Sequence, residues 1–209
     1  MSLTVALGGA RYAPDADDRA RFAAQHWVRL PRLFDDSLLA RFEASIAGAQ
    51  FAETAHASIA ASSRDLRVIG TVASELLVLL CNDPIVLHAV EDITGCEPLT
   101  RFNGSIYRML PDSGHQQTWH DDLIDGRRVT LSVNVGPRSY RGGVLEIRER
   151  ATRRPIARVP NPSRGDGVLF KLDPTLEHRV TSVTSGVKTA FAGWFRHGVP
   201  LRDELRGTV

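Results

Sequence analysis

The sequence predicts a mainly β fold with N-terminal helices (α+β): a double-stranded β-helix of the jelly-roll (cupin-like) type, packed on a helical layer. Two observations support this. Residues 1–97 carry apolar side chains at helical spacing, whereas residues 98–197 hold short strand-like segments separated by glycine-containing turns. Many short strands at such spacing are typical of a sandwich or a barrel. We therefore expect a single domain over residues 1–209, with a helical layer followed by a β-helix core.

The composition is that of an ordinary globular protein. Apolar residues make up 43% of the chain and charged residues 24%, with a net charge of +2. Because basic and acidic residues alternate along the chain, we expect no nucleic-acid partner. The N-terminus lacks the features of a signal peptide, and no stretch approaches the roughly 20 apolar residues of a membrane helix. We expect a cytoplasmic protein that does not bind a membrane; its oligomeric state cannot be predicted from the sequence.

Helices are predicted in the first half of the chain from apolar periodicity and capping residues. The expected ranges are Asp15 to Trp27, Asp35 or Asp36 to Gly48, Val72 to Cys81, and Asp83 to Thr94. The last one begins with an aspartate followed by a proline and ends at Gly95, a favourable start and stop for a helix. Between these helices, Val28 to Phe34 is expected to be an extended link and Phe51 to Ser63 a loop or weak strand.

Short strands are predicted through the second half. They are Leu99 to Leu110, Arg128 to Val135, Gly143 to Arg148, Ile156 to Val159, Gly167 to Leu172, His178 to Val183 and Lys188 to Phe195. Within Val129 to Val135, apolar residues at odd positions alternate with Thr130, Ser132 and Asn134, which should place the two sets on opposite faces. The apolar face should pack on the helices. The polar face either lines a ligand cavity or faces solvent.

Three side chains form a candidate metal site. His120 and Asp122 are two residues apart on an extended segment, so both should project from one face. His178, at the start of another predicted strand, would supply the third ligand. Two imidazoles and one carboxylate leave positions open on a non-haem Fe(II) ion for a chelating co-substrate and O2. In the alternative interpretation, His120 is a capping or core residue and the neighbouring Asp121 and Asp122 lie in a solvated turn; Asp121 should in any case point away from the site.

A lysine follows the distal histidine by ten residues. Lys188 should share one strand face with Ala190, Ala192 and Trp194, whose small members leave room around the ammonium group. In that position Lys188 could pair with a carboxylate of a bound small molecule. The alternative is a surface lysine with no role in binding.

Together these segments resemble a known family. The shared features are His120-x-Asp122, Gly142-Gly143-Val144-Leu145, Gly165-Asp166-Gly167, and His178 followed by Lys188 and Trp194. In order and spacing they resemble the 2-oxoglutarate/Fe(II) dioxygenase superfamily, especially its prolyl 4-hydroxylase-like branch, over about Leu99 to Arg196. That branch often has arginine where this chain has Lys188.

The resemblance implies site residues and cofactors. Iron(II) would be bound by His120, Asp122 and His178, and these three would be the catalytic residues. The co-substrate 2-oxoglutarate would contact Lys188, with further contacts from Tyr107 and Asn134, and O2 would be the oxidant. The implied reaction is hydroxylation of an aliphatic C–H bond, with release of succinate and CO2.

The resemblance leaves the substrate class and the type of oxidation less narrowly defined. The substrate would be an amino acid, a peptidyl residue or a small metabolite, selected by loops near the cavity mouth. Asp122 favours hydroxylation, because halogenating relatives lack this carboxylate; desaturation and ring chemistry stay open. Two other functions also stay open: a sensor that binds metal or 2-oxoglutarate without turnover, and a cupin-type metal enzyme.

Overall fold

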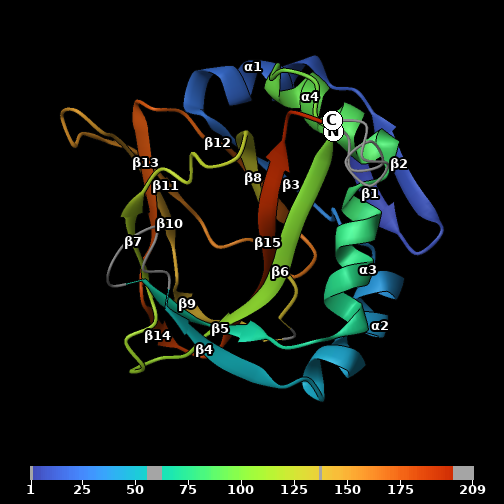
Figure 1. The fold of residues 1–209 in the computed structure, drawn as a ribbon, viewed down its shortest axis with the longest axis vertical. Helices are drawn as coiled ribbons and strands as arrows, with labels where there is room; N and C mark the ends of the chain where they lie inside the picture. The colour runs from blue at the N-terminus through green and yellow to red at the C-terminus, as the bar shows by residue number, and fades with distance from the viewer. Residues whose placement is uncertain (1, 56–62, 137, 200–209) are drawn as a thin grey trace.

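The structure is a computed structural model and describes residues 2–55, 63–136 and 138–199. Figure 1 shows three layers: a small sheet, a large sheet and a layer of helices. The large sheet has the strand order β3-β12-β8-β15-β6-β5-β4, and the small sheet has the order β11-β10-β13-β7. Neighbouring strands in both sheets are antiparallel. The two sheets face each other as a double-stranded β-helix, which confirms the predicted fold class.

The strand bounds are as follows. The large sheet comprises β3 (Trp27–Leu30), β12 (Gly167–Lys171), β8 (Arg127–Asn134), β15 (Lys188–Arg196), β6 (Arg101–Met109), β5 (Arg64–Val68) and β4 (Phe51–Ala55). The small sheet comprises β11 (Pro155–Val159), β10 (Leu145–Glu149), β13 (Leu176–Val180) and β7 (Gln117–His120). Two short pairs complete the set, β1 (Ser2–Ala6) with β2 (Gly9–Ala13) and β9 (Arg141–Gly142) with β14 (Val183–Ser185).

The helices of the described ranges lie where the sequence predicted them. They are α1 (Ala16–Gln25), α2 (Asp36–Ala47), α3 (Val72–Cys81) and α4 (Pro84–Thr94). Asp15, Asp35, Thr71 and Asp83 cap their N-termini, each accepting a hydrogen bond from a backbone N–H of the first turn. Among the described residues no single helix is long and apolar enough to cross a membrane; only α3 and α4 together pass that test, across a 60° bend.

The N-terminal part contains more β structure than predicted. The β1-β2 hairpin was not expected, the link after α1 forms β3 at the edge of the large sheet, and β4 and β5 extend the opposite edge. Residues 56–62, within the predicted loop or weak strand, lie outside the described residues. These strands form because the sheet offers pairing partners: β3 pairs with β12, and β5 pairs with β6.

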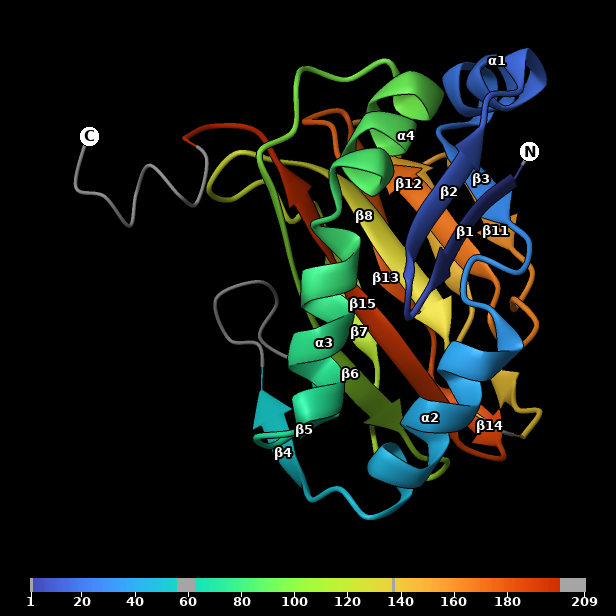
Figure 2. The same ribbon diagram turned by 90° about the vertical axis from the view of Figure 1, so that its right-hand side faces the viewer.

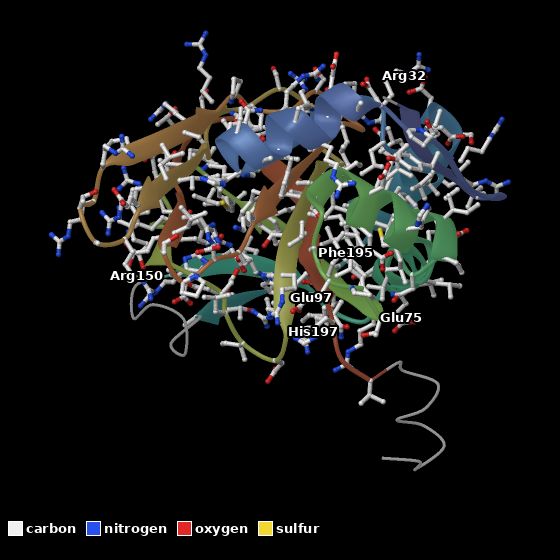
Figure 3. The ribbon with its side chains drawn as sticks, turned by 90° about the horizontal axis from the view of Figure 1, so that it is seen from above. Arg32, Glu75, Glu97, Arg150, Phe195 and His197 are labelled. Atoms are coloured by element: carbon white, nitrogen blue, oxygen red, sulfur yellow. The ribbon has the colours of Figure 1, made fainter. Side chains whose placement is uncertain are left out.

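The main core lies between the large sheet and the helices, which cover one face of that sheet in Figure 2. Val129, Leu131 and Val133 of β8 belong to this core, which confirms the predicted face. Phe195 of β15, also seen in Figure 3, is completely buried there. Fully burying such a side chain contributes about 1.5–3 kcal/mol. The opposite face of the large sheet is thereby directed at the small sheet.

Two glycines permit close contact of β6 and β15. A Cβ atom at Gly193 would lie 2.1 Å from the Asn103 carbonyl oxygen and 2.5 Å from the Gly104 Cα. Because β15 is held between two strands, it cannot move away, so we expect Gly193→Ala to lower the free energy of unfolding by about 3 kcal/mol. Urea unfolding followed by circular dichroism measures this change. Gly48→Ala is the control, since its nearest neighbouring atom lies 4.0 Å away; equal stability of both variants would contradict the prediction.

Candidate functional site

Two histidines are cross-strand neighbours in the small sheet. β7 and β13 are neighbouring strands, and their register places His120 directly opposite His178. The ring centroids are 4.2 Å apart, and the residues are 8% and 5% exposed. Strand pairing thus brings together two imidazoles that are distant in the sequence.

A turn, not a strand, brings the carboxylate to them. β7 ends at His120, and Asp122 follows with a positive φ of 57°, while its carbonyl accepts a hydrogen bond from Ile124 N–H. The prediction that His120 and Asp122 project from one face of a strand was therefore wrong, because Asp122 lies outside β7. The two side chains nevertheless lie close together. Asp122 Oδ2 lies 3.5 Å from His120 Nε2 and 3.4 Å from His178 Nε2.

The neighbouring acid points away, as predicted. Asp121 Oδ1 accepts a hydrogen bond from Leu123 N–H, and Oδ2 pairs with Arg150. Arg150 lies at the outer side of the small sheet in Figure 3, far from the buried Phe195. Asp121 is therefore a partly exposed residue outside the cluster and a natural comparison for Asp122.

The tautomer of His120 follows from its hydrogen bond. Its Nδ1 lies 2.5 Å from the carbonyl oxygen of Thr118, which can only accept a hydrogen bond. Nδ1 must then carry the proton, which leaves the lone pair of Nε2 directed at Asp122 and His178. This is the usual way in which a backbone carbonyl orients a metal-binding histidine.

Burial and mutual contact set the charges of the three groups. Burial alone would raise the pKa of Asp122, but the adjacent imidazoles of His120 and His178 lower it well below its usual range. Burial lowers the pKa of His178. Burial alone would also lower the pKa of His120, but the neighbouring Asp122 carboxylate raises it. The site thus holds an ionised carboxylate.

The donor set fits a divalent transition metal. The ligand atoms of His120, Asp122 and His178 all lie within 4.8 Å of one another, and all three residues are buried. Two imidazole nitrogens and one carboxylate oxygen on one side of an ion match the non-haem Fe(II) arrangement, which keeps positions open for other ligands. The three residues therefore fit such an ion.

A cavity of about 60 Å³ extends from this cluster to Lys188. The lysine is 6% exposed, and its Nζ donates a hydrogen bond to the Gly143 carbonyl oxygen at 2.7 Å. Within the described ranges, no carboxylate forms an ion pair with it. A buried ammonium group costs free energy unless it is paired, so the arrangement fits an anionic ligand that completes the charge balance.

Tyr107 and Asn134, the other two residues expected to contact 2-oxoglutarate, line different cavities. Tyr107 lines the same cavity, with its ring centroid 5.8 Å from Lys188 Nζ. Asn134 lines an adjoining cavity, where its amide oxygen accepts from Gly136 N–H and its amide nitrogen donates to the Pro162 carbonyl. The Asn134 amide is thus engaged by backbone groups.

Sequence reasoning missed Tyr140. Its ring centroid lies 5.9 Å from Lys188 Nζ, and burial raises the pKa of its hydroxyl. Tyr140 belongs to the connection after β8, where the sequence has no periodic signal. Its position depends on a distant turn, because Gly186 packs against the Tyr140 backbone so closely that a Cβ would lie 3.1 Å from its Cα.

Two polar residues also line the cavity. Arg67 of β5 makes a two-point ion pair with Asp65, at 2.8 and 3.0 Å, and donates to Ser105 Oγ at 2.7 Å. Gln117 of β7 donates to the same aspartate at 3.3 Å. Both Arg67 and Gln117 contribute to the cavity wall. Neither residue was singled out from the sequence.

Comparison with known proteins agrees with this geometry. Residues 102–196 match the model of the 2OG-Fe(II) oxygenase superfamily. Among curated protein sequences, none is significantly similar to the chain.

Solved structures share the fold at low sequence identity. An oxidoreductase of the 2OG-Fe(II) oxygenase family from Burkholderia pseudomallei has a TM-score of 0.66 and 18% identity, covering 95% of this chain and 99% of that one. A prolyl-4-hydroxylase from Pseudomonas putida has a TM-score of 0.60 and 17% identity, covering 88% and 99%. The carbocyclase SnoK from nogalamycin biosynthesis has a TM-score of 0.58 and 15% identity, covering 94% and 91%. At these identities the similarity establishes the fold.

Proposed function

We propose that this chain hydroxylates an aliphatic C–H bond of its substrate. Through residues 102–196 the chain belongs to the 2OG-Fe(II) oxygenase superfamily. In this proposal His120, Asp122 and His178 bind Fe(II), and Lys188 binds the distal carboxylate of 2-oxoglutarate. The observation that carries the proposal is one cavity with a buried three-ligand cluster at one end and a buried ammonium group at the other.

Each of these residues has a defined task. When bound, iron and 2-oxoglutarate supply the oxidising chemistry, in which O2 is consumed, 2-oxoglutarate becomes succinate and CO2, and the substrate gains one oxygen atom. His120 offers the Nε2 lone pair that its bond to Thr118 leaves available. Lys188 supplies a positive charge in a water-poor environment, where electrostatic attraction to a carboxylate is strong. Leu145, Phe170 and Val180 form an apolar wall of this cavity, which excludes water.

The substrate side of the cavity supports a polar small molecule or free amino acid. A substrate next to the metal cluster would meet Arg67 and Gln117, which the metal and 2-oxoglutarate do not require. Such fixed polar groups provide orientation in an otherwise apolar site. A peptidyl residue remains the second substrate class, as the fold is shared with a prolyl-4-hydroxylase. A cytoplasmic location and the lack of a nucleic-acid partner also remain predictions.

Succinate release in the presence of Fe(II), 2-oxoglutarate, O2 and candidate substrates tests the proposal. We expect succinate to form only when Fe(II) is present, and a matching amino acid or small metabolite to accelerate its formation. Mass spectrometry should then find a product heavier by one oxygen atom. A protein that binds Fe(II) and 2-oxoglutarate but forms no succinate with any library member would contradict turnover and favour a sensor.

A further inference from the structure

The Asp122 carboxylate needs support from outside its own segment. Because Asp122 lies in a turn after β7, no strand pairing fixes its side chain. A carboxylate on a turn can rotate, and it can offer a metal either one oxygen or both. Residues that hydrogen-bond to such a ligand restrict this freedom and increase metal affinity.

The large sheet provides that support. Trp194 of β15 donates its indole Nε1–H to Asp122 Oδ2 at 2.8 Å. This oxygen is also the one that faces both histidines. β15 pairs with β6 and β8 on its two sides, so the indole extends from one of the best-anchored strands in the fold.

A second contact to the Asp122 carboxylate comes from Arg127, at the start of β8. Its Nη1 lies 3.4 Å from Asp122 Oδ1, the other carboxylate oxygen. Its guanidinium group also lies over the Trp194 ring, 3.7 Å from the centroid. The arginine therefore contacts both the carboxylate and the residue that holds it, and its side chain is only 11% exposed.

We propose that Trp194 and Arg127 are positioning residues that fix the Asp122 carboxylate so that it offers a single oxygen to the metal. The inference rests on the proposed metal site. With one donor on each oxygen, rotation of the carboxylate would break at least one contact. The indole N–H leaves a second lone pair of Oδ2 for the metal, whereas the arginine keeps Oδ1 turned away.

Titration of metal-depleted protein with Co(II), by calorimetry and visible absorption, tests this inference without turnover. Trp194→Phe keeps an aromatic ring but removes the N–H, so we expect the Kd for Co(II) to rise by about 10-fold or more. The Co(II) absorption spectrum should also change, because an unrestrained carboxylate alters the coordination. Arg127→Met should raise the Kd by a smaller factor.

Trp119→Phe is the matched control. Trp119 precedes His120 in the chain, but its ring packs against the guanidinium groups of Arg148 and Arg179, at 4.1 and 4.7 Å. We expect its Kd and spectrum to equal those of the wild type. Equal Co(II) binding by the wild type and Trp194→Phe would overturn the inference, as would equal weakening by the two tryptophan variants. Failure of the wild type to bind Co(II) would instead contradict the proposed function.

A measurement on the wild type covers the case in which Trp194→Phe does not fold. In ¹⁵N-labelled protein, the indole N–H of Trp194 should exchange with solvent far more slowly than that of Trp119, because only the former is held by a buried carboxylate. Exchange at equal rates would overturn the inference.

Discussion

Asp122→Ala should eliminate Fe(II)-dependent succinate formation, whereas Asp121→Ala should leave it unchanged. Asp122 supplies the only carboxylate among the three clustered ligands, and its loss leaves two neutral imidazoles. We expect the loss of activity to exceed the roughly 10- to 100-fold effect of losing an outer-shell partner. Metal content after dialysis and succinate formation measure both parts of this prediction.

The two aspartates make a strict comparison because they are adjacent in the sequence. Asp121 is partly exposed, pairs with Arg150 and takes no part in the cluster. If Asp122→Ala retained full turnover, the ligand assignment would be wrong. If Asp121→Ala were equally inactive, the effect would reflect damage to the turn and not loss of a ligand.

Lys188→Met should raise the KM for 2-oxoglutarate by about 30-fold or more, with a much smaller change in the Fe(II) requirement. Losing one partner of a buried, hydrogen-bonded charge pair costs about 2–5 kcal/mol, and about 1.4 kcal/mol corresponds to a factor of ten. Methionine keeps an unbranched side chain of similar length, so the effect can be attributed to the lost charge. Succinate formation at varied 2-oxoglutarate and Fe(II) concentrations measures it.

The chain contains one other lysine, which serves as the control. Lys171 is 43% exposed in its side chain and pairs with Asp173 at 2.7 Å. Lys171→Met should leave the KM for 2-oxoglutarate unchanged. An unchanged KM in Lys188→Met would remove this residue from the co-substrate site while leaving the metal cluster unaffected.

Local signals predicted much of the fold. The capping aspartates located α2 and α4, and strict alternation in β8 identified which face packs on the helices. The strands β3 and β5 were missed for physical reasons. β3 has four residues and is followed directly by Pro31, and the Arg64–Val68 segment is largely charged. Its charges are tolerated because Asp65 and Arg67 pair with each other, which only the tertiary structure reveals.

The candidate site was predicted in part. His120, Asp122 and His178 were grouped by residue type and spacing, and the structure brings them together. The turn at Asp122 was not predicted, because a positive φ at an aspartate has no specific sequence signal. Tyr140 and the Trp194 contact were missed because each depends on long-range packing between segments that are separate in the sequence.

The position of the cavity between the two sheets has a mechanical consequence. The histidines belong to the small sheet, whereas Lys188 and Trp194 belong to the large one. A dicarboxylate chelated to the metal and bound to Lys188 would act as a non-covalent crosslink between the halves of the barrel. Separating the two sheets would then require release of both the metal ion and the dicarboxylate. The free energy of unfolding should therefore increase with the concentrations of these two ligands.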